Sequence, residues 1–334
     1  MRAKPRGPYG RPVLIDSSDL PAAQGALNRR AFVAAASTAA GALSLSAASA
    51  QDKKPSTHGP FWPNGARLAI ALSMVVETGG DPAPTTKGPD GKAYPDLYAA
   101  TAERYPANEG IPRMLDMLDR RKVKATTMIC GQSCEKYPAL AKDIAQRGHE
   151  IGAHGHQHDV QFNMEREAER AFMQKSRDTI ASVTGQTPVG YNCRGQLRSP
   201  NTLSIAQELG FVYHIDDISR DEPFVMTVNN KPFGVVPYTS HLNDIGYFNN
   251  RGFAAPFAAE LKYEFDALLA EAATRRRLMV VTMHDAIARA SRIKAFEDFV
   301  AYAQSHKGVW FARGDELARW ALGSTDSIKD PAAA

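Results

Sequence analysis

The sequence predicts one α/β domain, built on a parallel sheet that closes or nearly closes into a barrel. Short apolar runs alternate with longer amphipathic segments seven times along the chain, the order expected when helical crossovers join parallel strands. No internal repeat or linker interrupts residues 66–322, so we expect a single catalytic domain there. Glycines follow close after four of the predicted helices, as helix C-caps do, at Gly148, Gly185, Gly210 and Gly308.

The individual elements follow from the same pattern in chain order. The short apolar runs predict strands at residues 67–76, 124–129, 150–153, 189–192, 212–216, 234–237, 278–284 and 309–312. The amphipathic stretches between them predict helices at residues 111–121, 138–147, 164–184, 200–209, 256–276 and 289–305. This count suits a closed or nearly closed barrel better than an open sheet.

Residues 1–50 are predicted to be a leader that ends in an export signal. Arg29-Arg30-Ala31-Phe32-Val33 opens a mildly apolar run at 34–47, which ends in Ala48-Ser49-Ala50, a small-x-small cleavage pattern. The paired arginines resemble a twin-arginine signal, and the run is short and rich in Ser and Gly for a membrane span. We therefore expect a periplasmic or secreted protein, delivered by the twin-arginine export machinery and free of the membrane after cleavage.

The remaining boundaries place a linker at residues 51–65 and a tail at residues 323–334. Residues 1–50 hold six of the 40 Lys and Arg residues and two of the 36 Asp and Glu residues, leaving 34 of each sign in the rest. A neutral remainder gives no reason to expect nucleic acid as a partner. Cys130 and Cys134 are close enough in sequence to pair, but small buried thiols are an equally good interpretation.

The most informative segment is histidine-rich and follows the predicted strand 150–153. Four of the nine histidines lie between His149 and His158, and His154 and His158 are four residues apart. Imidazole is a common ligand of divalent transition metals, and this spacing lets both rings reach one ion. The alternative is a solvated, histidine-rich loop without an ion. His149 and His156 are better read as structural.

Chemically suggestive side chains share the same end of their predicted strands. Glu77 follows strand 67–76, Arg194 follows strand 189–192, and His284 closes strand 278–284. Active-site residues of α/β barrels gather at the carboxyl ends of the strands, so we expect one site containing these residues together with His154 and His158. Candidate substrate-binding residues at this end are Asp216, Asp217, Tyr238, Asn243 and Asp244.

Two imidazoles and a carboxylate would leave open positions on a zinc-like ion. Such an ion polarises a carbonyl oxygen and lowers the pKa of bound water towards ~7. His284 could then protonate the departing nitrogen, and Arg194 could orient the substrate. These parts suit hydrolysis of an amide. No nucleophile elbow, phosphate-binding loop or dinucleotide fingerprint is visible.

The run from Gly148 to His158, Gly-His-Glu-Ile-Gly-Ala-His-Gly-His-Gln-His, resembles the metal motif of the polysaccharide deacetylase (NodB-homology) superfamily. The resemblance covers residues 66–322 and implies a distorted (β/α)7 barrel that hydrolyses a non-peptide C–N bond. Residues 190–195, 236–239 and 305–313 resemble the branch that holds allantoinases, cyclic-imide hydrolases and some peptidoglycan deacetylases.

The chain departs from the chitin-type pattern, in which paired aspartates after the first strand serve as base and ligand. Glu77 and Thr78 stand there, so Glu77 is a candidate for either role. The resemblance therefore implies a divalent metal, zinc by preference. The alternative is a metal-free mechanism, as in some allantoinases of this branch that resemble the same pattern. The expected substrate is an N-acetylated amino-sugar glycan; the alternatives are a small cyclic amide or imide, or a catalytically silent carbohydrate-binding barrel.

The export signal gives a direct prediction. Replacing Arg29 and Arg30 together with Lys should leave the precursor inside the cell, because the twin-arginine receptor reads the arginine pair and not its charge alone. Fractionation of cells that express the double variant measures this. Undiminished export would mean that the general secretory route carries the protein.

Overall fold

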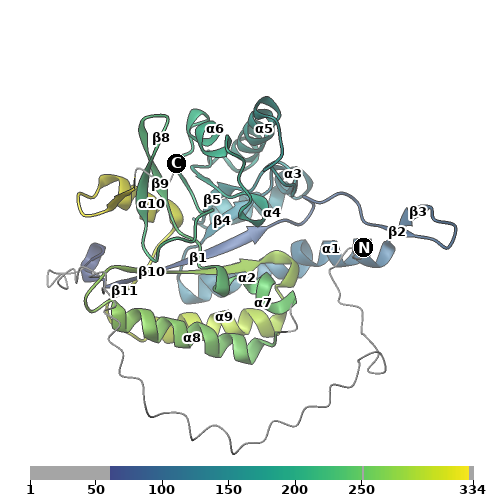
Figure 1. Cartoon of the computed structure of the whole chain (residues 1–334). Coiled ribbons are helices and arrows are strands. Elements are labelled where there is room, and N and C mark those ends of the chain that lie inside the picture. The colour runs from purple at the N-terminus through teal and green to yellow at the C-terminus, as the bar shows by residue number, and fades with distance from the viewer. Residues whose placement is uncertain (1–60, 250–251, 331–334) are drawn as a thin grey trace, which may run out of the picture. The chain divides into compact units, whose positions relative to one another are not determined.

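The structure is a computed structural model, and it describes residues 61–249 and 252–330. One sheet organises these residues, with strands in the order β10-β1-β4-β5-β6-β7-β9-β8-β12, and β11 pairs with β1 beside β4 (Figure 1). Eight strands run parallel to one another: β1 (Leu68–Val76), β4 (Thr126–Ile129), β5 (Glu150–Ala153), β6 (Gly190–Tyr191), β7 (Tyr213–His214), β9 (Lys231–Val235), β10 (Arg277–His284) and β11 (Val309–Phe311). β8 (Phe224–Val228) and β12 (Ile328–Asp330) complete the sheet. The predicted single-domain α/β fold is confirmed.

The helices cover the outer face of this sheet. The longer helices are α2 (Ile111–Arg121), α4 (Pro138–Gln146), α5 (Arg166–Thr184), α6 (Thr202–Glu208), α8 (Ala254–Glu271), α9 (Ala290–Gln304) and α10 (Gly314–Gly323). In Figure 1, α8 and α9 lie on one side of the molecule, and α5 and α6 lie on the other. The short helix α3 (Gly131–Lys136) follows the end of β4, and the short helix α7 (Asp244–Asn249) follows a 3-10 turn at Ser240–Leu242.

Alternating side chains on the strands divide the core in two. Leu68, Ile70 and Leu72 of β1 belong to the large cluster between sheet and helices, whereas Ala69 and Ala71 belong to a smaller cluster on the other face. Successive side chains of a strand point to opposite faces, so a strand that is buried on both sides is continuously apolar. All nine residues of β1 are buried for this reason.

Trp62 belongs to the smaller cluster and fills its end near the starts of the strands. Its ring lies 5.8 Å from Trp310 and 4.8 Å from Trp320, and the Arg276 guanidinium lies 4.3 Å from the Trp320 ring. These contacts extend the packed body to residues before the predicted boundary at 66. They seal the end of the sheet that is opposite the carboxyl ends of the strands.

The two ends of the strand order approach each other, with the segments next to β9 and β8 meeting β10. No continuous hydrogen-bonded strand pairing joins them within the described residues. The segment after β9 runs along β10: Val280 N donates to Thr239 Oγ1 at 3.1 Å, and Asn243 forms an isolated bridge with Thr282. The segment before β8 also meets β10, because Leu278 N donates to Asp221 O at 2.7 Å. The arrangement is barrel-like, and irregular segments take the place of a closing strand.

The sequence analysis missed several elements. β8 (Phe224–Val228) pairs antiparallel with β9, and their connection places Asn229 and Asn230 at positive φ. Such a two-residue turn is typical of a hairpin, so this strand interrupts the expected parallel order. β12 (Ile328–Asp330) pairs with β8 and lies inside the predicted tail. The helix expected to reach residue 276 ends at Glu271.

No helix in residues 61–249 or 252–330 has the length and hydropathy of a membrane span.

A further missed segment lies between β1 and α2. It contains the β2 (Thr85–Lys87) and β3 (Ala93–Pro95) hairpin, followed by α1 (Leu97–Tyr105). Both strands are exposed throughout, and no residue of α1 is buried. Because these residues bury no apolar face, they lack the periodic pattern by which the other elements are recognised.

Candidate metal centre

Strand register brings the candidate residues together. Val76 of β1 pairs with Ile129 of β4, and Ile129 pairs with Ala153 of β5. Glu77 and His154 are the next residues along their strands, so they leave the sheet in the same row. His284 pairs with Val75 from the other side of β1. Parallel pairing therefore places a carboxylate and imidazoles from distant parts of the chain at one end of the sheet.

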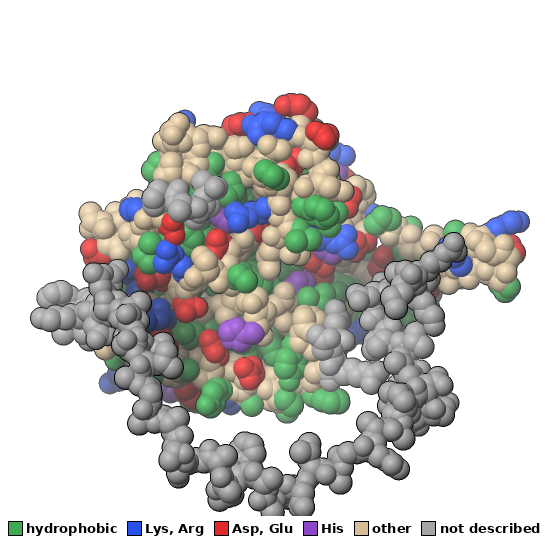
Figure 2. Space-filling view, in the orientation of Figure 1, with side chains coloured by type: hydrophobic (Ala, Val, Ile, Leu, Met, Phe, Trp, Pro, Cys, Tyr) green, Lys and Arg blue, Asp and Glu red, His purple; other side chains and the backbone are tan. Residues whose placement is uncertain are grey.

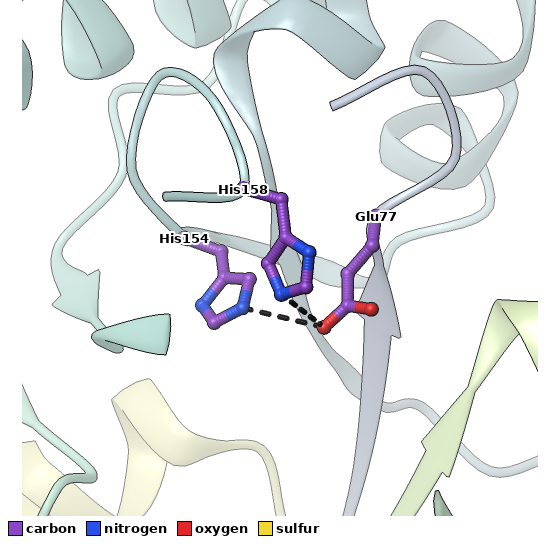
Figure 3. A group of neighbouring side chains, drawn as sticks. All are labelled: Glu77, His154 and His158. Atoms are coloured by element: carbon purple, nitrogen blue, oxygen red, sulfur yellow. Dashed lines mark ion pairs between the residues drawn. The ribbon is translucent and has the colours of Figure 1, made fainter. Parts of the chain in front are cut away.

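Glu77, His154 and His158 form a group whose candidate ligand atoms lie within 4.8 Å of one another (Figure 3). Oε1 of Glu77 lies 3.1 Å from His158 Nε2 and 3.5 Å from His154 Nε2. Burial would raise the pKa of Glu77, but hydrogen bonds from His154 and His158 and the nearby His284 hold it well below its usual range. An ionised carboxylate facing two imidazole nitrogens is a donor set that fits a divalent transition metal.

The His154 ring is oriented by the backbone of the neighbouring strand end. Its Nδ1 lies 3.0 Å from the carbonyl oxygen of Asn192. A carbonyl oxygen only accepts, so Nδ1 donates to it and Nε2 is the ring nitrogen that faces Glu77. Asp216 supports this arrangement, because its carboxylate accepts hydrogen bonds from Asn192 Nδ2 at 2.6 Å and from Cys193 N at 3.0 Å.

His158 is held from two sides. Its Nδ1 lies 3.2 Å from Asp81 Oδ1, and Arg194 Nη1 donates to the His158 carbonyl oxygen at 2.9 Å. Burial lowers the pKa of His158, but Asp81 and Glu77 outweigh burial and raise it to about 9. A metal ion must displace the Nε2 proton, so its affinity for this site should fall as the pH is lowered.

His284 faces the same carboxylate from β10. Its Nε2 lies 3.9 Å from Glu77 Oε1, and its Nδ1 lies 2.7 Å from Asp244 Oδ1. The Asp244 carboxylate also accepts the His284 backbone N–H, at 2.9 Å to Oδ2. Burial lowers the pKa of His284, but the hydrogen bond and charge of Asp244 outweigh it and raise that pKa. A raised pKa favours the imidazolium form, which is the form a general acid needs.

Asp285 fixes the backbone that carries Glu77. Its Oδ2 accepts hydrogen bonds from Glu77 N at 3.0 Å and Thr78 N at 2.9 Å, and its side chain is completely buried. Burial is the largest cause that raises the pKa of Asp285, to about 7. The sequence analysis missed both Asp285 and Asp81. The position of Asp285 directly after His284 was a usable signal, whereas nothing in the loop sequence pointed to Asp81.

The five residues predicted to bind substrate occupy different places. Asp216 and Asp244 are buried behind the histidines that they support, rather than in a pocket wall. Tyr238 is buried in the smaller core cluster, and Asn243 Oδ1 accepts the Ile245 N–H at 3.0 Å. Asp217 lies outside the group of Glu77, His154 and His158, and caps the turn at Ser219 N at 2.8 Å. The strand-end pattern does not separate residues that face substrate from those that orient an imidazole ring, so the substrate-binding role of these five residues stays a prediction.

His149 and His156, the two histidines predicted to be structural, are buried. His149 Nδ1 accepts the Ala125 N–H at 3.0 Å, and His156 is buried 3.8 Å from Glu135. Cys130 and Cys134 are buried free thiols, so no disulfide joins them.

Comparisons with known proteins show what this chain is similar to. The polysaccharide deacetylase family model matches residues 92–214, which include His154, His158 and Arg194. A peptidoglycan deacetylase of Helicobacter pylori is 26% identical over 243 residues, covering 63% of this chain and 82% of that protein.

Two solved structures are similar over most of the chain. The structure of a probable polysaccharide deacetylase from Pseudomonas aeruginosa PAO1 has a TM-score of 0.72 at 29% identity and covers 80% of this chain and 95% of that one. The structure of Puue allantoinase has a TM-score of 0.71 at 27% identity and covers 80% and 94%.

The geometry predicts that His154→Ala and His158→Ala each lose metal binding while the fold is kept. Each substitution removes one ligand nitrogen and little core volume. Elemental analysis after dialysis, with circular dichroism as the check on folding, measures the effect. His241→Ala is the control, because His241 is exposed and pairs with Glu264 at 3.3 Å. Wild-type protein that is active and free of metal would contradict the prediction.

Proposed function

We propose that this chain, which carries a polysaccharide deacetylase domain and is a hydrolase of non-peptide C–N bonds, removes N-acetyl groups from an amino-sugar glycan outside the cytoplasm. One observation carries the proposal. Glu77, His154 and His158 form a candidate metal site, and a histidine with a raised pKa, His284, faces the same carboxylate. Hydrolysis of an amide needs an activated water and a proton for the departing nitrogen, and this arrangement can supply both.

Glu77, His154 and His158 would hold the metal, and zinc suits a set of two imidazoles and one carboxylate. When bound, the ion would polarise the acetyl carbonyl and lower the pKa of a water molecule. Glu77 is the one carboxylate of this group, so it would serve either as a ligand of the ion or as the base that accepts a proton from the attacking water. Thr78 follows Glu77 and has no carboxylate for this purpose.

His284 would complete the reaction from the other side. Its Nε2 donates a proton to the amide nitrogen while the C–N bond breaks, which releases acetate and a free amine. Its Nδ1 keeps the hydrogen bond to Asp244 throughout, and this carboxylate stabilises the imidazolium before the transfer. Arg194 holds the His158 backbone, so we assign it to the support of the metal site.

Ring opening of a small cyclic amide is the second candidate. The reaction breaks the same kind of bond, and the similarity to Puue allantoinase favours it. The expected export favours the glycan, since amino-sugar polymers lie outside the cytoplasm. The arginine pair and the cleavage pattern behind this expectation fall in residues 1–50, which lie outside the described residues.

A paired substrate assay separates the candidates. The purified protein is loaded with zinc and incubated with N-acetylglucosamine oligomers, with acetate release as the readout, and with allantoin and hydantoin, with ring opening as the readout. We expect acetate release. Ring opening without acetate release would replace the glycan proposal by the second candidate, and neither activity with zinc bound would indicate a binding barrel.

His284→Ala should slow the C–N cleavage step about 10²–10⁴-fold, the usual contribution of a general acid, and leave zinc content unchanged. Asp244→Asn should lower the pKa of His284, because it removes the charge that raises this pKa. A general acid must be protonated, so the rate falls as the pH rises through its pKa. The variant should therefore lose activity at a lower pH than the wild type.

The pH–rate profiles of wild type and Asp244→Asn measure this, with melting temperatures as the check on folding. An unshifted alkaline limb in a well-folded Asp244→Asn variant would show that His284 does not act as the acid.

A further inference from the structure

Glu169 places a carboxylate on the buried face of α5. That face is formed by residues at helical spacing, Glu169, Met173, Ser176 and Ile180, and all four are fully buried. Figure 2 shows other acidic side chains at the surface of the molecule, where water solvates them. Removing a carboxylate from water costs free energy unless hydrogen bonds replace the water, so the partners of Glu169 indicate its role.

Three donors surround the Glu169 carboxylate, and they come from two connections. Thr202 Oγ1 donates to Oε1 at 2.5 Å, and Ser199 Oγ donates to Oε2 at 2.5 Å. Gln161 Nε2 donates to Oε1 at 3.2 Å, and Gln161 Oε1 accepts the Tyr191 hydroxyl at 2.7 Å. Gln161 lies in the loop after β5, whereas Ser199 lies in the loop after β6. One carboxylate therefore joins the loops of two neighbouring strands.

Both loops carry residues of the candidate metal site. His158 lies shortly before Gln161 in the chain, and Arg194 lies shortly before Ser199. Arg194 Nη1 donates to the His158 carbonyl oxygen at 2.9 Å, so the two loops also meet beside the site. Neither loop contains a strand, so its position depends on hydrogen bonds and packing outside the sheet. Glu169 supplies such hydrogen bonds to both loops at once.

The same face of α5 also contacts the segment between His154 and His158. Ser176 Oγ donates to Gly155 O at 2.7 Å. Gly155 has a φ of +73°, and a Cβ at this position would lie 2.7 Å from the ring of Phe172 on α5. The helix therefore lies directly behind the histidine segment, with no room for a larger residue between them.

We propose that Glu169 is a positioning residue of the metal site. It holds the loops after β5 and β6 together, so that Arg194 reaches the backbone of His158. The His158 imidazole then lies 3.1 Å from Glu77. Glu169 does not touch the metal or the substrate, and it acts only through the two loops. This role rests on the metal site of the proposed function.

The variant Glu169→Gln tests the proposal, because glutamine keeps the size of the side chain and replaces one acceptor oxygen by a donor. The zinc dissociation constant of the folded variant should rise about 10-fold, the lower end of the range for residues that orient metal ligands. Glu167→Gln is the matched control, since Glu167 is exposed on the same helix, and it should leave the constant unchanged. Zinc titration measures the constants, with melting temperature as the check on folding.

A double-mutant cycle separates positioning from general stabilisation of α5. Arg194→Met removes the contact between the two loops, so adding Glu169→Gln to that variant should raise the zinc dissociation constant less than about 3-fold. Equal effects of Glu169→Gln in both backgrounds, or an unchanged constant in the folded single variant, would overturn the proposal. If Glu169→Gln does not fold, Ser199→Ala takes its place in the cycle, because it removes one hydroxyl donor of the carboxylate.

Hydrogen exchange of the metal-free protein gives a readout that does not depend on zinc. Peptides from the loops after β5 and β6 should exchange faster in Glu169→Gln than in the wild type or in Glu167→Gln. Unchanged exchange in both loops would also overturn the proposal. A wild type that binds no zinc would remove the metal site of the proposed function, and exchange would then decide whether Glu169 holds the loops.

Discussion

The buried carboxylate of Glu77 is the constraint on which the site depends. Three imidazoles, those of His154, His158 and His284, approach its Oε1 within 3.9 Å. A carboxylate that is largely removed from water is costly unless positive charge or hydrogen-bond donors surround it. Here those donors are the groups that can also bind a metal or transfer a proton. The histidines that stabilise this buried charge are therefore also the candidate residues of the hydrolytic site.

Each imidazole has an acceptor behind it, and two of these acceptors, Asn192 and Asp244, are buried. Asn192 O orients His154, Asp81 orients His158, and Asp244 orients His284. Orienting partners of this kind set the tautomer of a ring and its basicity. Asp285 does the same for the backbone of Glu77. The supports come from strand ends and from loops alike, since Asn192 follows β6 whereas Asp81 lies in the loop after β1.

Much of this arrangement was accessible from the sequence, for a physical reason. A parallel sheet aligns the carboxyl ends of its strands, so the positions of Glu77, His154 and His284 after apolar runs were enough to predict that they meet. The exact helix bounds of residues 111–121 and the strand bounds of 150–153 were also correct. The similarity to deacetylase structures agrees with the family that the histidine motif indicated.

The features that the sequence did not predict depend on the conformation of loops and on the directions of side chains and strands. Asp81 reaches His158 only because the loop after β1 turns back towards β5, and no periodic pattern encodes that turn. Asp216 lies just beyond β7 and Asp244 begins α7, and their carboxylates accept hydrogen bonds from Asn192 and from His284. The β8–β9 hairpin was missed although Asn229-Asn230 is a turn sequence, because the parallel interpretation left no place for an antiparallel strand.

The most direct test of the account is a parallel measurement of zinc content and acetate release on one preparation of Glu77→Gln. Glutamine keeps the shape of Glu77 and removes the charge that the three histidines surround. The account predicts a folded protein with little zinc and little acetate release from N-acetylglucosamine oligomers, while the wild type binds one zinc ion per chain and releases acetate. A variant that releases acetate at the wild-type rate, with or without zinc, would contradict the account.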